Sequence, residues 1–272
     1  MSENEMSGNG LKIIELDILK YIKRCCEENN LQYYLAYGTL LGAVRHQGFI
    51  PWDDDIDIWM PRKDYNKFLE LEFHNKNAKY KVLSCKNDMQ YYYEIAKVVA
   101  LNTHLEEKGL LPIKDYGVYV DVFPLDGLPK YYKAILFLFK CMGIMKMAAV
   151  NIQPAKNLKH KNRAWLFRFI GIVSTLLGAR KYAWIVDKLA QKTAPEKSVQ
   201  LGCLVSGEGK KDIYDGEIFS SVVKLKFEDE YFDAPGGYCQ CLSQLYGDYM
   251  TLPPENERVS KHIFNAYYKK EV

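Results

Sequence analysis

Hydrophobic and polar residues follow two different periods along this 272-residue chain, and each period predicts a different element. Residues 11–28 place leucine and isoleucine at helical spacing between charged residues, which predicts an amphipathic helix. Residues 118–123 place valine at every second position, which predicts a strand with two distinct faces. The same criteria predict further strands over 32–37, 55–59, 80–83, 91–100 and 224–227, and helices over 39–47, from 61, over 131–150 and 165–190, and from 238. The pattern therefore predicts an α/β or α+β fold, a small mixed sheet flanked by helices, with a helical insertion.

The composition is typical of a globular protein, with 48% hydrophobic and 26% charged residues. The seven cysteines are an odd number, and Cys239 and Cys241 lack the usual zinc spacing, so we expect reduced thiols. Residues 1–10 are polar and do not form a signal peptide. These features predict a cytoplasmic location.

The charge of the chain is divided between two parts. No acidic residue lies between Gly127 and Val186, where eleven Lys and Arg residues give +11, whereas the rest carries 26 basic against 34 acidic residues, or −8. The uncharged run of eleven residues at 169–179 is shorter than the roughly 20 residues of a membrane-spanning helix. We therefore expect a basic, apolar insertion that does not span a membrane.

Two interpretations of this insertion remain open. Lys130, Lys133 and Lys140 fall on one arc of a helix, which we expect to lie opposite apolar residues such as Phe137 and Ile144. Such a helix can lie on an anionic membrane, here the inner face of the plasma membrane. The alternative is a helical subdomain with lysines at its rim. No RNA-binding or DNA-binding motif accompanies the basic residues, so we predict no nucleic acid partner.

The segment 53–57 carries four carboxylates in five positions between apolar residues. Like charges this close resist burial, and a divalent cation relieves their repulsion. If the segment is an extended strand, Asp55 and Asp57 share one face, where they can hold Mg²⁺ or Mn²⁺, and Asp54 faces away. Asp53 is an outer ligand in this interpretation. Asp121, in a strand of otherwise apolar residues, is the expected third carboxylate.

A glycine and a hydroxyl precede these acids at the predicted start of a helix. We expect Thr39 to cap the helix and Gly38 to let a phosphate approach the backbone N–H groups. Arg45, one to two turns further on, can reach the same phosphate or pair with a carboxylate. A phosphate site followed by metal-binding aspartates predicts phosphoryl or nucleotidyl transfer.

The acidic segment is also compatible with a solvated loop, an EF-hand or the DxD metal site of a glycosyltransferase. EF-hand ligand positions one, three, five and twelve are matched by Asp53, Asp55, Asp57 and Asp64. However, Ile58 replaces the required glycine and Pro61 falls inside the loop. The spacing does not separate a glycosyltransferase from a phosphotransferase. Lys97, Lys261 and His262 are further candidates for binding the donor phosphates, with a surface role as the alternative for each.

Long motifs in the chain resemble the LicD family of bacterial phosphotransferases. The similarity is carried by residues 37–58, YGTLLGAVRHQGFIPWDDDIDI, by residues 121–126, DVFPLD, and by residues 246–254, YGDYMTLPP. The resemblance implies a nucleotidyltransferase-like fold, distantly shared with fukutin-related proteins. It divides the chain into a catalytic core over 1–127, the insertion over 128–200 and a part over 201–272 that completes the core.

The resemblance also implies an activity and a site. The expected reaction transfers phosphocholine or a related phospho-alcohol from a CDP-activated donor, such as CDP-choline, to a lipid-linked or nascent glycan of teichoic acid, capsule or lipopolysaccharide, releasing CMP. Gly38 and Thr39 match the donor phosphate site, Asp55 and Asp57 the metal pair, and Asp121 the third carboxylate. A non-catalytic, membrane-associated partner in glycan assembly is the alternative from another functional class.

Overall fold

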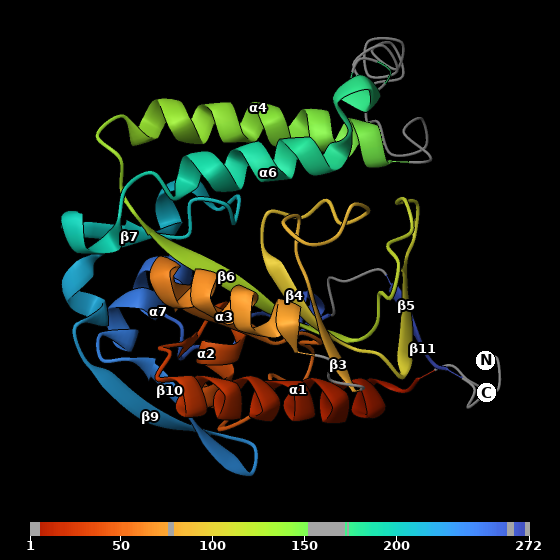
Figure 1. Ribbon diagram of the computed structural model, residues 1–272. Coiled ribbons are helices and arrows are strands. Elements are labelled where there is room, and N and C mark those ends of the chain that lie inside the picture. Colours follow the sequence, from red (N-terminus) through yellow and green to blue (C-terminus); the bar gives the residue numbers. More distant parts are fainter. Residues whose placement is uncertain (1–5, 76–78, 152–171, 173, 260–263, 270–272) are drawn as a thin grey trace.

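The structure is a computed structural model that describes residues 6–75, 79–151, 172, 174–259 and 264–269 (Figure 1). Its helices are α1 (Gly8–Asn29), α2 (Tyr37–Arg45), α3 (Arg62–His74), α4 (Tyr132–Val150), α6 (Ala179–Ala190) and α7 (Tyr238–Tyr246). Its strands are β1 (Tyr34–Leu35), β2 (Asp57–Pro61), β3 (Tyr80–Leu83), β4 (Ala96–Ala100), β5 (Thr103–Glu107), β6 (Tyr119–Gly127), β7 (Gln200–Gly202), β8 (Ile213–Asp215), β9 (Val222–Phe227), β10 (Glu230–Pro235) and β11 (Phe264–Tyr268).

A mixed sheet forms the centre of the molecule, in the order β1-β2-β6-β4-β3, with β7 and β8 added at the end of β6. β2 and β6 are parallel, whereas β1 and β4 run antiparallel to their neighbours β2 and β6. Two antiparallel pairs, β9 with β10 and β5 with β11, lie outside this sheet. The predicted α/β class with a small mixed sheet is confirmed.

One face of the sheet packs against helices α1 and α3. The predicted amphipathic helix α1 buries Ile18, Leu19 and Ile22 completely, in one core with Val120 and Val122 of β6. Full burial of each such aliphatic side chain contributes about 1.5–3 kcal/mol. Because strand side chains alternate, Asp121, which lies between these valines, faces the opposite side of the sheet.

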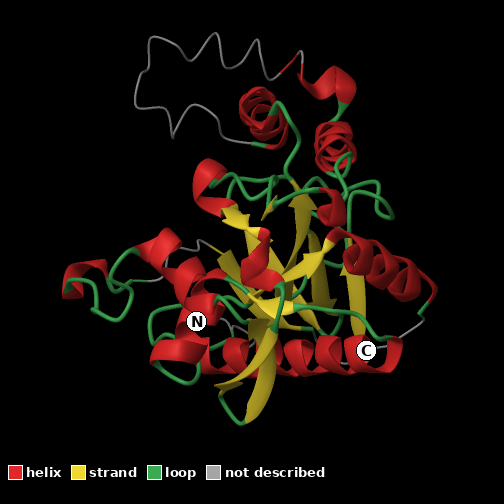
Figure 2. Ribbon diagram, turned by 90° about the vertical axis from the view of Figure 1, so that its left-hand side faces the viewer, coloured by secondary structure: helices red, strands yellow, loops and turns green. Residues whose placement is uncertain are grey.

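Helices α4 and α6 lie side by side as a separate layer at the end of the molecule opposite α1 (Figures 1 and 2). Arg62, at the start of α3, connects this layer to the sheet: its Nε donates to Asp126 Oδ1 of β6 at 2.6 Å, and its Nη1 donates to Asp187 Oδ1 of α6 at 2.6 Å. All three side chains are buried. A buried cluster of opposite charges thus fixes α6 to the core.

The expected arrangement of lysines on α4 is wrong. Phe137 is 70% exposed and Ile144 is also exposed, on the same side of the helix as the exposed Lys133 and Lys140. Phe137 follows Lys133 by four residues and precedes Lys140 by three, and this spacing places side chains on one helix face. The outer face of α4 is therefore both basic and apolar.

Several predicted boundaries also differ from the structure. Strand β4 begins at Ala96 rather than at residue 91, and the segment predicted as helix from 238 ends at Tyr246, before strand β11. Gly247 ends α7 with a φ of 70°, a conformation that a glycine adopts without strain. Most of the predicted helix before Ala179 lies outside the described residues. No helix in the described part of the chain is long and apolar enough to cross a membrane.

Candidate active site

Three charged side chains form a row across the middle of the sheet. Asp57 of β2 pairs in parallel register with Asp121 of β6, and Asp121 pairs in antiparallel register with Lys97 of β4. Lys97 Nζ donates to Asp121 Oδ1 at 2.6 Å. The predicted meeting of Asp121 with the acidic segment is therefore present, since adjacent strands hold both side chains on the same face.

Lys97 is buried, with 4% of its surface exposed, and contacts two aromatic rings. Its ammonium lies 3.4 Å from the ring centroid of Tyr119 and 5.3 Å from that of Tyr93. Burial of an ammonium is costly unless a carboxylate and hydrogen bonds compensate. Lys97 is thus a built-in counter-charge of the carboxylates rather than a surface lysine.

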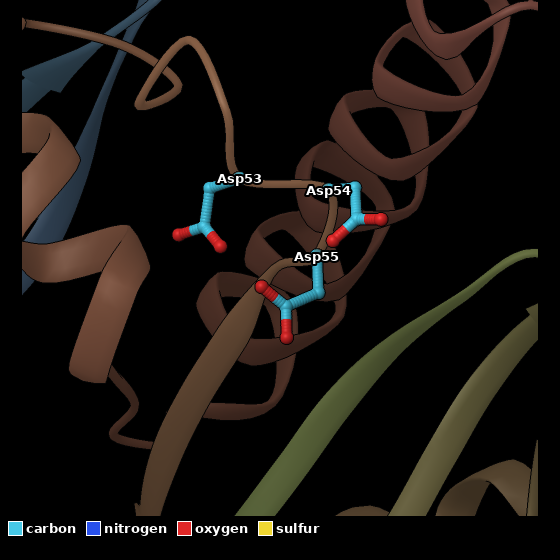
Figure 3. A group of neighbouring side chains, drawn as sticks. All are labelled: Asp53, Asp54 and Asp55. Carbon is cyan, nitrogen blue, oxygen red and sulfur yellow. The ribbon is translucent and has the colours of Figure 1, made fainter. Parts of the chain in front are cut away.

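The three aspartates before β2 lie in a loop, not in a strand (Figure 3). One carboxylate oxygen from each of Asp53, Asp54 and Asp55 lies within 4.8 Å of the others. The expectation that Asp54 faces away is therefore wrong, because the strand begins only at Asp57 and the alternation rule does not apply before it. Asp54 belongs to the same cluster as Asp53 and Asp55.

Gly38 and Thr39 lie beside the acids but differ in what they contact. A Cβ at Gly38 would lie 2.4 Å from Asp53 Oδ2, so the absence of a side chain makes room for that carboxylate. Thr39 is not the helix cap, because α2 begins at Tyr37 after Ala36. The buried Thr39 hydroxyl instead accepts a hydrogen bond of 2.9 Å from the Asp57 N–H and so fixes the start of β2.

An open cleft of about 1200 Å³ lies over the acidic loop. Asp53, Asp55 and Asp57 line it together with Gly38 and Arg45, and residues between 246 and 259 form another part of its lining. Arg45 Nη1 donates to the carbonyl of Tyr249 at 2.8 Å, which joins α2 to this C-terminal segment. The cleft is large enough for a nucleotide-sized ligand.

Burial raises the pKa of the Asp57 carboxyl well above its usual range, and the negative charges of Asp55 and Asp121 raise it further, whereas Lys97 opposes them. A group of this kind binds a proton or a cation readily. Lys261 and His262, the remaining predicted phosphate ligands, lie outside the described residues.

Two further features of the site were not expected from the sequence. Glu15 on α1 is 2% exposed, and burial together with the charges of Asp55 and Asp54 raises its pKa well above the usual range. Tyr37, at the edge of the cleft, donates from its hydroxyl to the buried Asp212 at 2.7 Å. The burial of Glu15 could have been predicted, because this glutamate occupies an apolar position of the α1 stripe. No pattern in the sequence predicts the contact of Tyr37 with Asp212, which lies 175 positions away.

Comparisons with known proteins identify relatives of this chain. The family described as LicD/FKTN/FKRP, nucleotidyltransferase domain, matches residues 30–140. The lipopolysaccharide cholinephosphotransferase LicD of Haemophilus influenzae is 32% identical over 263 residues, covering 94% of this chain and 96% of that protein. The human ribitol 5-phosphate transferase FKRP is 36% identical over 52 residues, or 19% of this chain and 10% of that protein. An uncharacterized Rickettsia prowazekii protein is 30% identical over 46% of this chain and 44% of its own length.

Proposed function

The chain belongs to the LicD family of phosphotransferases, and we propose that it transfers phosphocholine or a related phospho-alcohol from a CDP-activated donor to a hydroxyl of a lipopolysaccharide-type glycan precursor, releasing CMP. Precursors of teichoic acid or capsule are related acceptors of the same chemistry. The observation that carries this proposal is the row of Asp57, Asp121 and Lys97, whose first member lines a nucleotide-sized cleft together with Asp53 and Asp55 of the acidic loop.

The donor set fits a hard divalent cation, Mg²⁺ or Mn²⁺. Its members are carboxylates only, which Mg²⁺ prefers, and they include the buried Asp57. Asp55 and Asp57, with Asp121 beside them, would hold the ion. When bound, the ion would neutralise charge on the donor diphosphate and favour the departure of CMP.

The side chains of the site position the donor and the acceptor and supply a base for the acceptor hydroxyl. The acceptor oxygen bonds to the phosphorus that carries the choline, the bond from that phosphorus to the CMP oxygen breaks, and CMP leaves with the electron pair. The proton of the acceptor hydroxyl passes to Asp121, since Asp55 and Asp57 would hold the ion, and Lys97 fixes the position of the Asp121 carboxylate. Gly38 and Arg45 line the cleft on the side of α2, where a donor phosphate would meet them.

A screen of activated donors tests this proposal. The full chain would be incubated with Mg²⁺ and with CDP-choline, CDP-glycerol, CDP-ribitol or a nucleotide sugar, and the released nucleotide and thermal protection would be measured. We expect CMP release and protection with a CDP-alcohol, and loss of turnover with a folded protein for Asp57→Asn. Protection by a nucleotide sugar alone would favour the DxD glycosyltransferase, and protection by none of the donors would favour a non-catalytic partner.

We further propose that the outer face of α4 contacts an anionic membrane, where a lipid-linked acceptor would be available. The face combines exposed Phe137 and Ile144 with Lys133 and Lys140, a mixture that suits the headgroup region of a bilayer. Lys146 is not part of this face, since it is buried and paired with Glu94.

Flotation with vesicles containing anionic lipid tests the contact. At physiological salt we expect the wild-type protein to float and the Lys133→Glu, Lys140→Glu double variant to remain in the dense fraction. A matched change at Lys210 and Lys211, which lie outside α4, should leave flotation unchanged. A wild-type protein that does not float would overturn the membrane contact.

A further inference from the structure

Glu15 occupies a position in α1 at which the helix otherwise buries apolar side chains. Leu11, Ile18 and Ile22 lie on the same buried stripe, three to seven residues away. Glu15 is as buried as its apolar neighbours, with 2% of its surface exposed. An ionised carboxylate at such a position is costly unless hydrogen bonds or a cation compensate for the lost water.

Hydrogen bonds within the described residues do not supply that compensation. Glu15 Oε2 is buried and has no hydrogen-bond partner there. Lys12, one turn earlier on α1, points its ammonium elsewhere and donates to the backbone carbonyls of Ile50 at 3.2 Å and Pro51 at 3.4 Å. In the described part of the chain, one oxygen of this buried carboxylate therefore lacks the hydrogen-bond partner that buried polar atoms usually have.

Helix α1 lies against the segment that leads into the acidic loop, since Lys12 donates to the carbonyls of Ile50 and Pro51. The charges that act most strongly on Glu15 are those of Asp55 and then Asp54, which raise its pKa; the charge of Lys12 comes next and lowers it. Asp53, Asp54 and Asp55 each bring an oxygen within 4.8 Å of the others, in the arrangement of Figure 3. Glu15 of α1 is not one of these three, but it lies close enough for the charges of Asp55 and Asp54 to raise its pKa.

We propose that Glu15 is a ligand, through one water, of a divalent cation held by Asp54 and Asp55 on the α1 side of the acidic loop. Hard cations such as Mg²⁺ and Mn²⁺ take carboxylate oxygens and keep several waters, which matches a site with one buried and two partly exposed carboxylates. The cation would remove the repulsion among the acids and give the buried Glu15 oxygen its partner. The loop that carries the proposed catalytic aspartates would be fixed to α1 by this contact.

The inference rests on and deepens the proposed function, because it adds a cation on the α1 side of Asp55, beside the ion proposed at Asp55 and Asp57. It does not depend on the identity of the donor. If no CDP donor reacts but Mn²⁺ binding requires Glu15, the cation site stands and the proposed function fails. If CDP-choline reacts and Glu15→Gln binds Mn²⁺ with wild-type affinity, only this inference fails.

The test compares Glu15→Gln with the wild-type protein by calorimetric titration with Mn²⁺, and by melting temperature with EDTA and with Mn²⁺. The matched control is Glu27→Gln, the same change on an exposed position of the same helix. We expect Glu15→Gln to bind Mn²⁺ at least about tenfold more weakly than the wild-type protein, which is the usual cost of removing a residue that supports metal ligands. The control Glu27→Gln should bind Mn²⁺ as the wild-type protein does. With EDTA we expect Glu15→Gln to melt at the wild-type temperature or above it, since an uncompensated buried charge is gone.

Glu15→Asp keeps the charge but withdraws the carboxylate by one methylene group, so we expect an affinity between those of wild type and Glu15→Gln. Wild-type affinity and stoichiometry in Glu15→Gln would overturn the inference. A clear loss of melting temperature in Glu15→Gln with EDTA would overturn it as well, because it would mean that the native carboxylate is already compensated without a cation.

Discussion

Replacement of Lys97 by methionine removes the one ammonium paired with the acidic row in the described part of the sheet. At 2.6 Å and an effective dielectric constant of about 20, the attraction between Lys97 and Asp121 amounts to about 6 kcal/mol. Desolvation of both groups offsets part of this attraction. Methionine preserves most of the packing against Tyr119, so the change mainly exposes Asp121 and Asp57 to their mutual repulsion. We expect a loss of about 3–5 kcal/mol in the free energy of unfolding.

The assay is urea unfolding of Lys97→Met, Asp121→Asn and the double variant, with EDTA. Each single variant should lose stability, and the double variant should lose less than the two losses added, because it leaves neither charge alone. With Mg²⁺ present, the loss in Lys97→Met should shrink, since a bound cation neutralises the same carboxylates. The matched control is Lys81→Met, which breaks a partly exposed pair with Asp115 and should cost at most about 1 kcal/mol.

Two outcomes would show that this expectation is wrong. Additive losses in the double variant would mean that Lys97 and Asp121 do not interact energetically, despite the 2.6 Å separation of Nζ and Oδ1. A loss in Lys97→Met that equals the loss in Lys81→Met would mean that the row of charges is solvated rather than buried.

Other predictions concern the connection between layers, the acidic loop and the effect of pH. Arg62→Met removes the guanidinium from the buried Asp126 and leaves Asp187 with Lys86 as its cation, and it should lower the free energy of unfolding by about 3–5 kcal/mol in urea titrations. Gly38→Ala pushes the Asp53 carboxylate away and should weaken Mn²⁺ binding in calorimetry while the protein stays folded, whereas Gly143→Ala, which meets no atom within 4 Å, should change neither. Because the pKa of Asp57 is raised, protons compete with Mn²⁺ at a higher pH than they do for an ordinary aspartate. The Mn²⁺ affinity measured by calorimetry should therefore fall as the pH drops toward that raised pKa. In Asp57→Asn the affinity should depend less on pH.

The sequence predicted most of the core elements because their burial follows a regular period. Ile18 and Ile22 mark α1, and Val120 and Val122 mark β6, so periodicity places these side chains in the core. The meeting of Asp57 with Asp121 was expected from the chemistry of the acids, whereas the parallel direction of β2 and β6 that produces it was not predicted. Periodic burial and paired charges are thus readable from the sequence wherever an element is regular.

The errors fall where structure is irregular or where contacts are distant in sequence. Asp54 was misplaced because residues 53–56 form a loop, in which strand alternation has no meaning. Thr39 was misassigned as a cap because its partner is the N–H of Asp57, eighteen residues further on. Glu15 was overlooked because its role depends on packing between α1 and the acidic loop, which local patterns do not encode.

Metal-dependent phosphotransfer at the carboxylates around Asp57 is the core of the proposed function. The most direct test is the transfer of phosphocholine from CDP-choline to a purified glycan acceptor, followed by ³¹P NMR and CMP release, for wild type, Asp57→Asn and Asp55→Asn with Mg²⁺ and with EDTA. We expect transfer by the wild-type protein with Mg²⁺ only, and a loss of at least about a thousandfold in either variant with the fold intact. Transfer at a near wild-type rate by Asp57→Asn, or in the presence of EDTA, would contradict a metal-dependent site at Asp57.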